Sequence, residues 1–207
     1  MNRVQRAFLM ALLIGAAPRV ARAQAAPART PWSVFSARFD THTSDFIYSV
    51  YGYGSEFGMV GVLYNPRSTF NELLVGGGHR LSLAGQTQLV AVAAAREDGL
   101  WYSQLYILPT VRVGHVWLRA TSELDAPISS GGTLQYSLSP VSATVPVAGW
   151  LEVGAGADMG MARGSRTELD VGPEFRIALP SATLTVDGQR GLDATRNRLR
   201  IGFVAAF

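Results

Sequence analysis

The sequence predicts an all-β fold, an up-and-down antiparallel barrel of about twelve strands, with ten strands as the alternative. Short segments in which apolar and polar residues alternate fill residues 32–207, and turn residues separate them. The connections between these segments alternate between short, weakly charged ones and longer or more charged ones. After the N-terminal apolar segment, no run approaches the roughly 18 apolar residues that indicate a membrane-spanning helix.

The N-terminal segment has the three regions of a secretory signal peptide. Residues 1–6 carry two arginines, residues 7–17 are apolar, and small residues at Ala21 and Ala23 suit cleavage. The apolar region is shorter than the ~20 residues that a membrane anchor needs, so we expect cleavage rather than anchoring. The predicted division of the chain is a cleaved signal peptide (1–23), a short periplasmic lead (24–31) and one barrel domain (32–207).

Arginine supplies every basic residue, because the 18 Lys plus Arg residues include no lysine. Four of these arginines lie in residues 1–23, which leaves 14 Arg against 15 Asp plus Glu, a net charge of −1. The positive charge of the whole chain therefore belongs to the signal segment and gives no support for a nucleic-acid partner. The chain contains no cysteine, so a disulfide framework is excluded.

Each predicted strand is bounded by turn residues such as Gly, Pro, Ser, Asn and Asp. The short connections are expected at 54–56, 84–85, 108–110 and 179–181, and the longer or more charged ones at 41–44, 65–69, 96–99, 123–131, 163–166 and 189–197. Strict alternation is what an up-and-down barrel with both termini on one side requires. The exception is 140–145, bracketed by Pro140 and Pro146, which do not fit a strand interior. The predicted strands are 33–40, 45–53, 57–65, 70–82, 86–95, 100–108, 110–122, 131–139, 146–161, 166–178, 182–189 and 197–207.

The two faces of these strands differ in charge. In 166–178, Val171 and Phe175 share one face, whereas Asp170, Glu174 and Arg176 share the other. An arginine that faces hydrocarbon at the bilayer midplane costs roughly 2–4 kcal/mol, so in a membrane barrel the charged face must line the lumen. A soluble sandwich or soluble barrel would place the apolar face inside instead, and alternation alone does not separate these possibilities.

The last segment, 197–207, places Leu199, Ile201, Phe203 and Phe207 on one face and arginines on the other. This strand, which ends in an aromatic residue, together with the signal peptide resembles the bacterial outer-membrane β-barrel proteins as a class. The resemblance implies residence in the outer-membrane bilayer. It also implies that Phe203 and Phe207 form the signal that the barrel-assembly machinery reads.

Charged residues on the polar face are the candidate functional residues. Acidic residues dominate two neighbouring strands, 146–161 and 166–178, while the last strand supplies arginines next to the first. Opposed rows of charge would shape the field in a pore, whereas ion pairs that fill a narrow barrel would block it. The predicted lumen-facing charges are Arg38, Glu72, Arg80, Glu152, Asp158, Glu168, Asp170, Glu174, Arg176, Arg198 and Arg200.

The evidence for other chemistry is sparse. His42-Thr43-Ser44 has the His-x-Ser spacing of outer-membrane lipid hydrolases, but it falls in a predicted loop and no residue that orients the histidine can be named. Three histidines without metal-ligand spacing indicate no metal site and no cofactor. The triplet Gly76–Gly78 lacks the context of a phosphate-binding loop and more plausibly bends the wall or makes room for Trp150.

The sequence therefore predicts a non-enzymatic outer-membrane barrel, most simply a passive, porin-like channel for small polar solutes. A non-conducting structural barrel is the alternative, and a lipid hydrolase is a remote one. The oligomeric state stays open.

Overall fold

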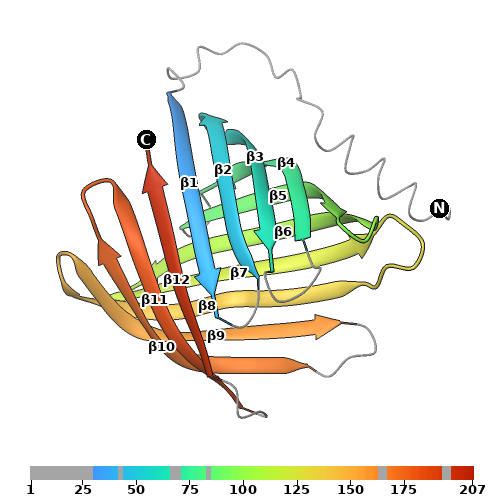
Figure 1. Ribbon diagram of the computed structural model, residues 1–207. Coiled ribbons are helices and arrows are strands. Elements are labelled where there is room, and N and C mark those ends of the chain that lie inside the picture. Colours follow the sequence, from blue (N-terminus) through green and yellow to red (C-terminus); the bar gives the residue numbers. More distant parts are fainter. Residues whose placement is uncertain (1–29, 42–43, 66–70, 83–84, 163–166, 193–196) are drawn as a thin grey trace.

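The computed structural model describes residues 30–41, 44–65, 71–82, 85–162, 167–192 and 197–207. In these residues, twelve antiparallel strands form one closed barrel in which chain neighbours pair (Figure 1). The predicted twelve-strand, up-and-down barrel is confirmed. The described part contains no helix that is long and apolar enough to span a membrane. The strands are β1 (Pro31–Asp40), β2 (Asp45–Tyr53), β3 (Glu56–Tyr64), β4 (Asn71–Leu81), β5 (Gln86–Arg96), β6 (Trp101–Val113), β7 (Val116–Pro127), β8 (Gln135–Ala148), β9 (Leu151–Ala162), β10 (Glu168–Ala178), β11 (Ala182–Gly191) and β12 (Asn197–Ala206).

The barrel closes between its first and last strands. β1 and β12 pair from Val34 opposite Ala206 to Asp40 opposite Arg200. Beyond this ladder, the Ser33 amide donates to the Phe207 carbonyl at 3.0 Å, and the Phe207 amide donates to the Ser33 carbonyl at 2.9 Å. The start of β1 and the C-terminus thus lie together at one end of the barrel, here called the terminal end (Figure 1).

Two predicted turns are wrong. β6 continues through Pro109 to Val113, and the chain turns at Gly114, whose φ is 61°. The segment 140–145 likewise lies inside β8, which turns only after Ala148. The pairing of β8 with β9 shifts between Leu138 and Val141 and again between Pro146 and Ala148, so irregularities accommodate both prolines within one strand. With these boundaries, every connection at the terminal end is short, and the exceptional long connection disappears.

The exterior of the barrel is apolar. On β3, for example, Val60, Val62 and Tyr64 are 46%, 44% and 52% exposed, whereas Phe57 on the opposite face is buried. Six charged side chains of β9–β12 are buried inside, namely Asp158, Asp170, Glu174, Asp187, Arg198 and Arg200. A soluble barrel or sandwich would show the opposite arrangement.

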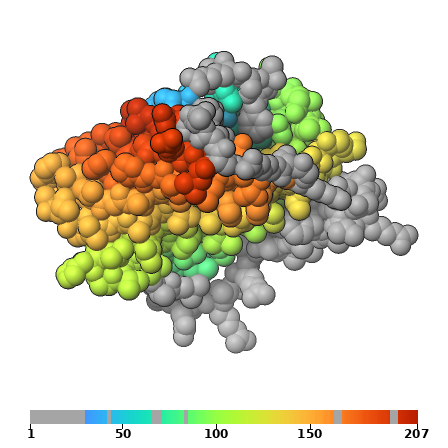
Figure 2. Space-filling model, turned by 90° about the horizontal axis from the view of Figure 1, so that it is seen from below, coloured from blue at the N-terminus to red at the C-terminus, as the bar shows by residue number. Residues whose placement is uncertain are grey.

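The interior has two unlike walls. Along β2–β6 the inward side chains are largely apolar, whereas along β7–β12 and β1 they are largely charged or polar. The outer surface in Figure 2 is coloured from red through orange and yellow to green, which is the order in which the strands from β12 to β6 pair with one another. The buried members of the apolar wall are Val50, Phe57, Leu74, Val90, Val92, Ala94, Tyr102 and Tyr106.

Glycines allow close approach of the backbone at the apolar wall. A Cβ on Gly78 would lie 2.2 Å from the Leu89 carbonyl oxygen and 2.5 Å from Cζ of Phe57. Of the two roles predicted for these glycines, the one that makes room for Trp150 is wrong, because Trp150 lies in the β8–β9 turn and is 57% exposed. Phe57 occupies the space instead, and it packs against Trp32 with ring centroids 5.8 Å apart.

Candidate functional site in the barrel lumen

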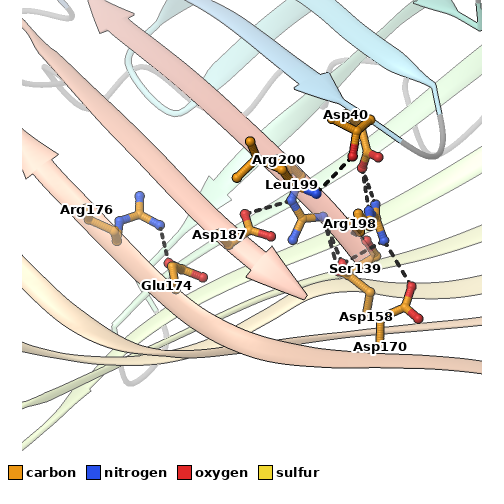
Figure 3. Close-up of polar contacts among 11 residues, drawn as sticks. Asp40, Ser139, Asp158, Asp170, Glu174, Arg176, Asp187, Arg198, Leu199 and Arg200 are labelled. Atoms are coloured by element: carbon orange, nitrogen blue, oxygen red, sulfur yellow. Dashed lines mark hydrogen bonds and ion pairs between the residues drawn. The ribbon is translucent and has the colours of Figure 1, made fainter. Parts of the chain in front are cut away.

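Arg198 joins three acidic side chains inside the barrel. On β12, this arginine lies 2.5 Å from the Asp40 carboxylate of β1, 2.9 Å from Asp158 of β9 and 3.6 Å from Asp170 of β10. All four side chains are at most 7% exposed (Figure 3). One guanidinium therefore links strands on both sides of the β1–β12 closure.

Arg200, two residues further along the same face, extends the network. Its Nε donates to Asp187 of β11 at 2.9 Å, and its Nη1 lies 3.1 Å from Asp158 Oδ2 and 3.5 Å from Ser139 Oγ of β8 (Figure 3). Ser139 is four strands away from β12, so this side chain crosses part of the lumen rather than lying along the wall. Arg200 is 2% exposed.

The acidic pair on β9 and β10 explains why two arginines gather here. Asp158 and Asp170 are directly opposite each other in the ladder, an arrangement that is destabilising for like charges. Burial strengthens the repulsion because the surroundings have a low dielectric constant. Arg198 contacts both carboxylates, and Arg200 contacts Asp158, so the arginines neutralise the pair.

A second polar group lies toward the terminal end of the charged wall. Arg119 of β7 pairs with Glu152 of β9 at 2.9 Å and donates to Thr144 Oγ1 at 2.8 Å. Thr144 in turn donates to Glu152 at 2.7 Å, so three strands share one closed set of contacts. Arg176 and Glu174, both on β10, pair at 3.3 Å.

A third group lies where the charged wall meets the apolar one. Glu72 of β4 lies 3.5 Å from Arg96 and accepts a hydrogen bond from Gln104 at 3.1 Å. The Tyr106 hydroxyl lies 2.7 Å from Glu123 Oε1, and Ser137 donates to the other oxygen of Glu123 at 3.0 Å. Polar side chains of β4–β8 thus continue the network around the barrel.

Two predicted residues lie toward the ends of the barrel. Glu168 is exposed at the beginning of β10, at the end of the barrel opposite the terminal end. Arg80 stacks on Trp32 near the terminal end, with its guanidinium 3.3 Å from the ring centroid. Arg38 lines the same cavity as Arg200, and its guanidinium lies 5.8 Å from the centroid of the Phe46 ring.

The prediction omitted several lumen charges. Asp187 alternates with Thr183, Thr185 and Gln189 on β11, a signal present in the sequence but not used. Arg119 lies within the predicted strand 110–122 but is absent from the predicted lumen charges, and Glu123 falls in the predicted connection 123–131, whereas β7 continues to Pro127. Arg96 was assigned to a loop, although it ends β5.

The two walls line a partly open cavity of about 250 Å³. Phe46, Val50 and Val90 line it from the apolar wall, and Arg38, Glu174 and Arg200 line it from the charged wall. The cavity is therefore amphipathic, whereas the sequence predicted opposed rows of charge and no apolar wall.

The hydrolase hypothesis rests on His42, which lies outside the described residues. The described part of the chain holds no cluster of three or more His, Asp or Glu side chains with the geometry of a metal site.

Comparisons with known proteins identify similar structures but no family. No protein-family model matches the sequence, and no curated protein matches it significantly. A KdgM porin in complex with disordered oligogalacturonate superposes with a TM-score of 0.61 over 85% of this chain and 99% of its own, at 7% identity. The NanC porin superposes with a TM-score of 0.54 over 84% of this chain and 98% of its own, at 8% identity.

The outer-membrane protein Omp33 of Acinetobacter baumannii is also similar, with a TM-score of 0.50 over 87% of this chain and 99% of its own, at 10% identity. Identities this low establish a common fold and nothing finer. The closed barrel, with its apolar exterior and its charged inner wall, therefore has the fold of the bacterial outer-membrane β-barrel proteins.

Proposed function

We propose that the protein is a small, porin-like outer-membrane channel that passes small polar solutes. The observation that supports this function best is the interior wall of β7–β12, where charged side chains face a cavity inside an otherwise apolar barrel. Charged lumen residues of this kind select solutes by their field. The similar fold of the KdgM and NanC porins is consistent with this proposal.

Export and membrane assembly are part of the same proposal. Residues 1–23 would direct secretion and be removed, residues 24–31 would form the periplasmic lead, and the outer-membrane bilayer would surround the barrel. The apolar exterior supports a lipid environment, because 46–52% exposure of Val60 and Tyr64 would be costly in water.

A non-conducting structural barrel is the second candidate, and one observation favours it. Arg200 reaches from β12 to Ser139 on β8, so its side chain narrows the lumen. Reconstitution of the purified protein into planar bilayers separates the two candidates. Stepwise conductance supports the channel, whereas a folded, heat-modifiable protein that stays silent in symmetrical KCl supports the structural barrel.

Arg176→Gln is expected to shift ion selectivity toward cations. Arg176 lines the cavity, and its side chain is 23% exposed, so its charge acts on passing ions. We expect the cation-to-anion permeability ratio to rise about twofold, equivalent to roughly 0.4 kcal/mol. The measurement is the reversal potential across a planar bilayer in a KCl gradient. Arg190→Gln is the matched control, since Arg190 is exposed on β11, and an equal shift there would contradict the assignment.

Phe207→Ala is expected to reduce assembly severalfold without breaking the closure of the barrel. The Phe207 ring is 77% exposed, while its backbone bonds to Ser33, so the substitution removes the predicted signal and keeps both hydrogen bonds. The measurement is the amount of heat-modifiable protein in outer-membrane fractions. Phe39→Ala removes another exposed aromatic ring and serves as the control. Normal assembly of Phe207→Ala would contradict the role of the terminal ring.

A further inference from the structure

We propose that the lumen cavity binds a small amphipathic anion, a molecule with one carboxylate group and an apolar body. The carboxylate would lie between Arg38 and Arg200, and the apolar body would lie against the inner faces of β2, β3 and β5. The inference deepens the proposed channel function by naming a solute class, and it rests on that function for passage, although binding itself needs no conductance.

The charged end of this site is defined by two guanidinium groups with unused donors. Nε of Arg38 and Nη2 of Arg200 are buried, and neither has a hydrogen-bond partner among the described residues. Arg38 forms no ion pair with any carboxylate in the described part of the chain, and the repulsion by Arg200 and Arg198 acts on it against a weaker attraction by Asp158 and Asp40. Buried donors in native proteins nearly always have partners, so this pair indicates a missing acceptor.

Each acidic side chain that lines the same cavity has a partner. Glu174 pairs with Arg176, and Asp187 accepts from Arg200 through Oδ2, while Asp187 Oδ1 has no hydrogen-bond partner among the described residues. Glu123 lies beside the Tyr106 hydroxyl and accepts from Ser137. Arg38 is therefore the cavity cation whose charge these contacts leave uncompensated. A carboxylate suits it, because guanidinium groups form strong, directional bonds with carboxylates.

The apolar end of the site lies next to the charged end. The Arg38 guanidinium is 5.8 Å from the centroid of the Phe46 ring, so the cation sits where the two walls meet. Val50, Met59 and Val90 continue the lining away from this point. A ligand whose carboxylate reaches Arg38 would thus have its body in contact with apolar side chains, which favour binding by about 25 cal/mol per Å² of buried apolar area.

The size of the cavity limits the ligand. An apolar cavity of about 150 Å³ is sufficient to hold benzene. The 250 Å³ available here accommodates one ring or a short acyl chain together with a carboxylate. Drug-sized ligands generally occupy larger pockets, so the site suits a small acid.

The test measures binding of matched probes to the folded barrel in detergent by isothermal titration calorimetry. Phenylacetate carries both features, phenylacetamide lacks the charge, acetate lacks the apolar body, and phenethylammonium reverses the charge. We expect phenylacetate to bind at least tenfold more tightly than each of the other three. Equal binding of phenylacetate and phenylacetamide, or tighter binding of phenethylammonium, would overturn the proposal. Octanoate is a fifth probe, and it distinguishes an acyl-chain acid from an aromatic acid as the preferred source of the carboxylate.

Arg38→Gln tests the site directly. The substitution removes the unpaired cation and breaks no ion pair among the described residues, so we expect a folded barrel whose phenylacetate affinity falls at least tenfold. Arg190→Gln, on the exposed face of β11, should bind phenylacetate like the original protein. Unchanged affinity in a heat-modifiable Arg38→Gln barrel would refute the site. If phenylacetate binding is lost in Arg38→Gln and the original protein gives no conductance in planar bilayers, the channel is refuted and the binding site stands.

Discussion

Replacing Arg198 with Leu is expected to lower the free energy of unfolding by about 3–5 kcal/mol, the range found when one partner of a buried ion pair is removed. Arg198 contacts Asp40, Asp158 and Asp170, and all of these side chains are buried. Without the arginine, the directly opposed Asp158 and Asp170 would repel each other, although Arg200 would still contact Asp158. The measurement is urea unfolding in detergent, followed by tryptophan fluorescence.

Two further variants give this experiment its controls. Arg190→Leu removes an arginine from an exposed position and should change stability by less than about 0.5 kcal/mol. Arg198→Lys retains the charge but not the planar fork that reaches several carboxylates, so it should recover only part of the loss. A loss below about 1 kcal/mol for Arg198→Leu would show that the network does not hold the barrel closed.

Gly172→Ala is expected to destabilise the barrel by about 3 kcal/mol or more, the upper range for overpacking. A Cβ at this position of β10 would lie 1.8 Å from the Gly188 carbonyl oxygen and 2.8 Å from the Gln189 Cα, both backbone atoms of β11. No change of rotamer relieves such a contact, so the two strands must separate. The same urea titration measures the loss.

Gly160→Ala is the matched control for Gly172→Ala. Gly160 lies on the neighbouring strand β9, also on an inward face, but a Cβ there meets no atom within 4 Å. The control should be neutral or stabilising by up to about 1 kcal/mol, because alanine restricts the unfolded chain more than glycine does. Equal losses in the two variants would show that the close approach of β10 and β11 is not the cause.

The sequence was sufficient for the fold because most strands show alternating faces and alternating connection types. Pro109, Pro140 and Pro146 are the exceptions: proline is rare in strand interiors and so predicts a turn at each position, yet the strands continue through all three. The structure places Pro140 and Pro146 at interruptions in the pairing of a continuing strand. Local sequence does not reveal which of these two outcomes occurs, because the choice depends on the partner strands.

The lumen was only partly predictable. Charges on β9, β10 and β12 alternate with apolar residues, and their shared face was visible in the sequence. The apolar wall was not visible in the sequence. Phe57 and Met59 point inward on β3, but the outward residues between and beside them, such as Val60, are equally apolar. The two faces of this strand therefore show no contrast. Contacts across the lumen, such as Arg200 to Ser139, depend on strand number and stagger, which no single strand encodes.

The difference between the apolar and the charged wall of the barrel also bears on the proposed export of the unfolded chain. Asp45 and Glu56, the first residues of β2 and β3, are the only charged residues between positions 45 and 65, so neither strand has a charged face. In β9–β12, by contrast, one face of each strand carries charged or polar side chains. In the export proposed above, the N-terminal half would be delivered first, so the segment most prone to self-association would wait for its charged partners to emerge. A barrel built this way would depend on periplasmic holding factors more strongly than one with a uniformly polar interior.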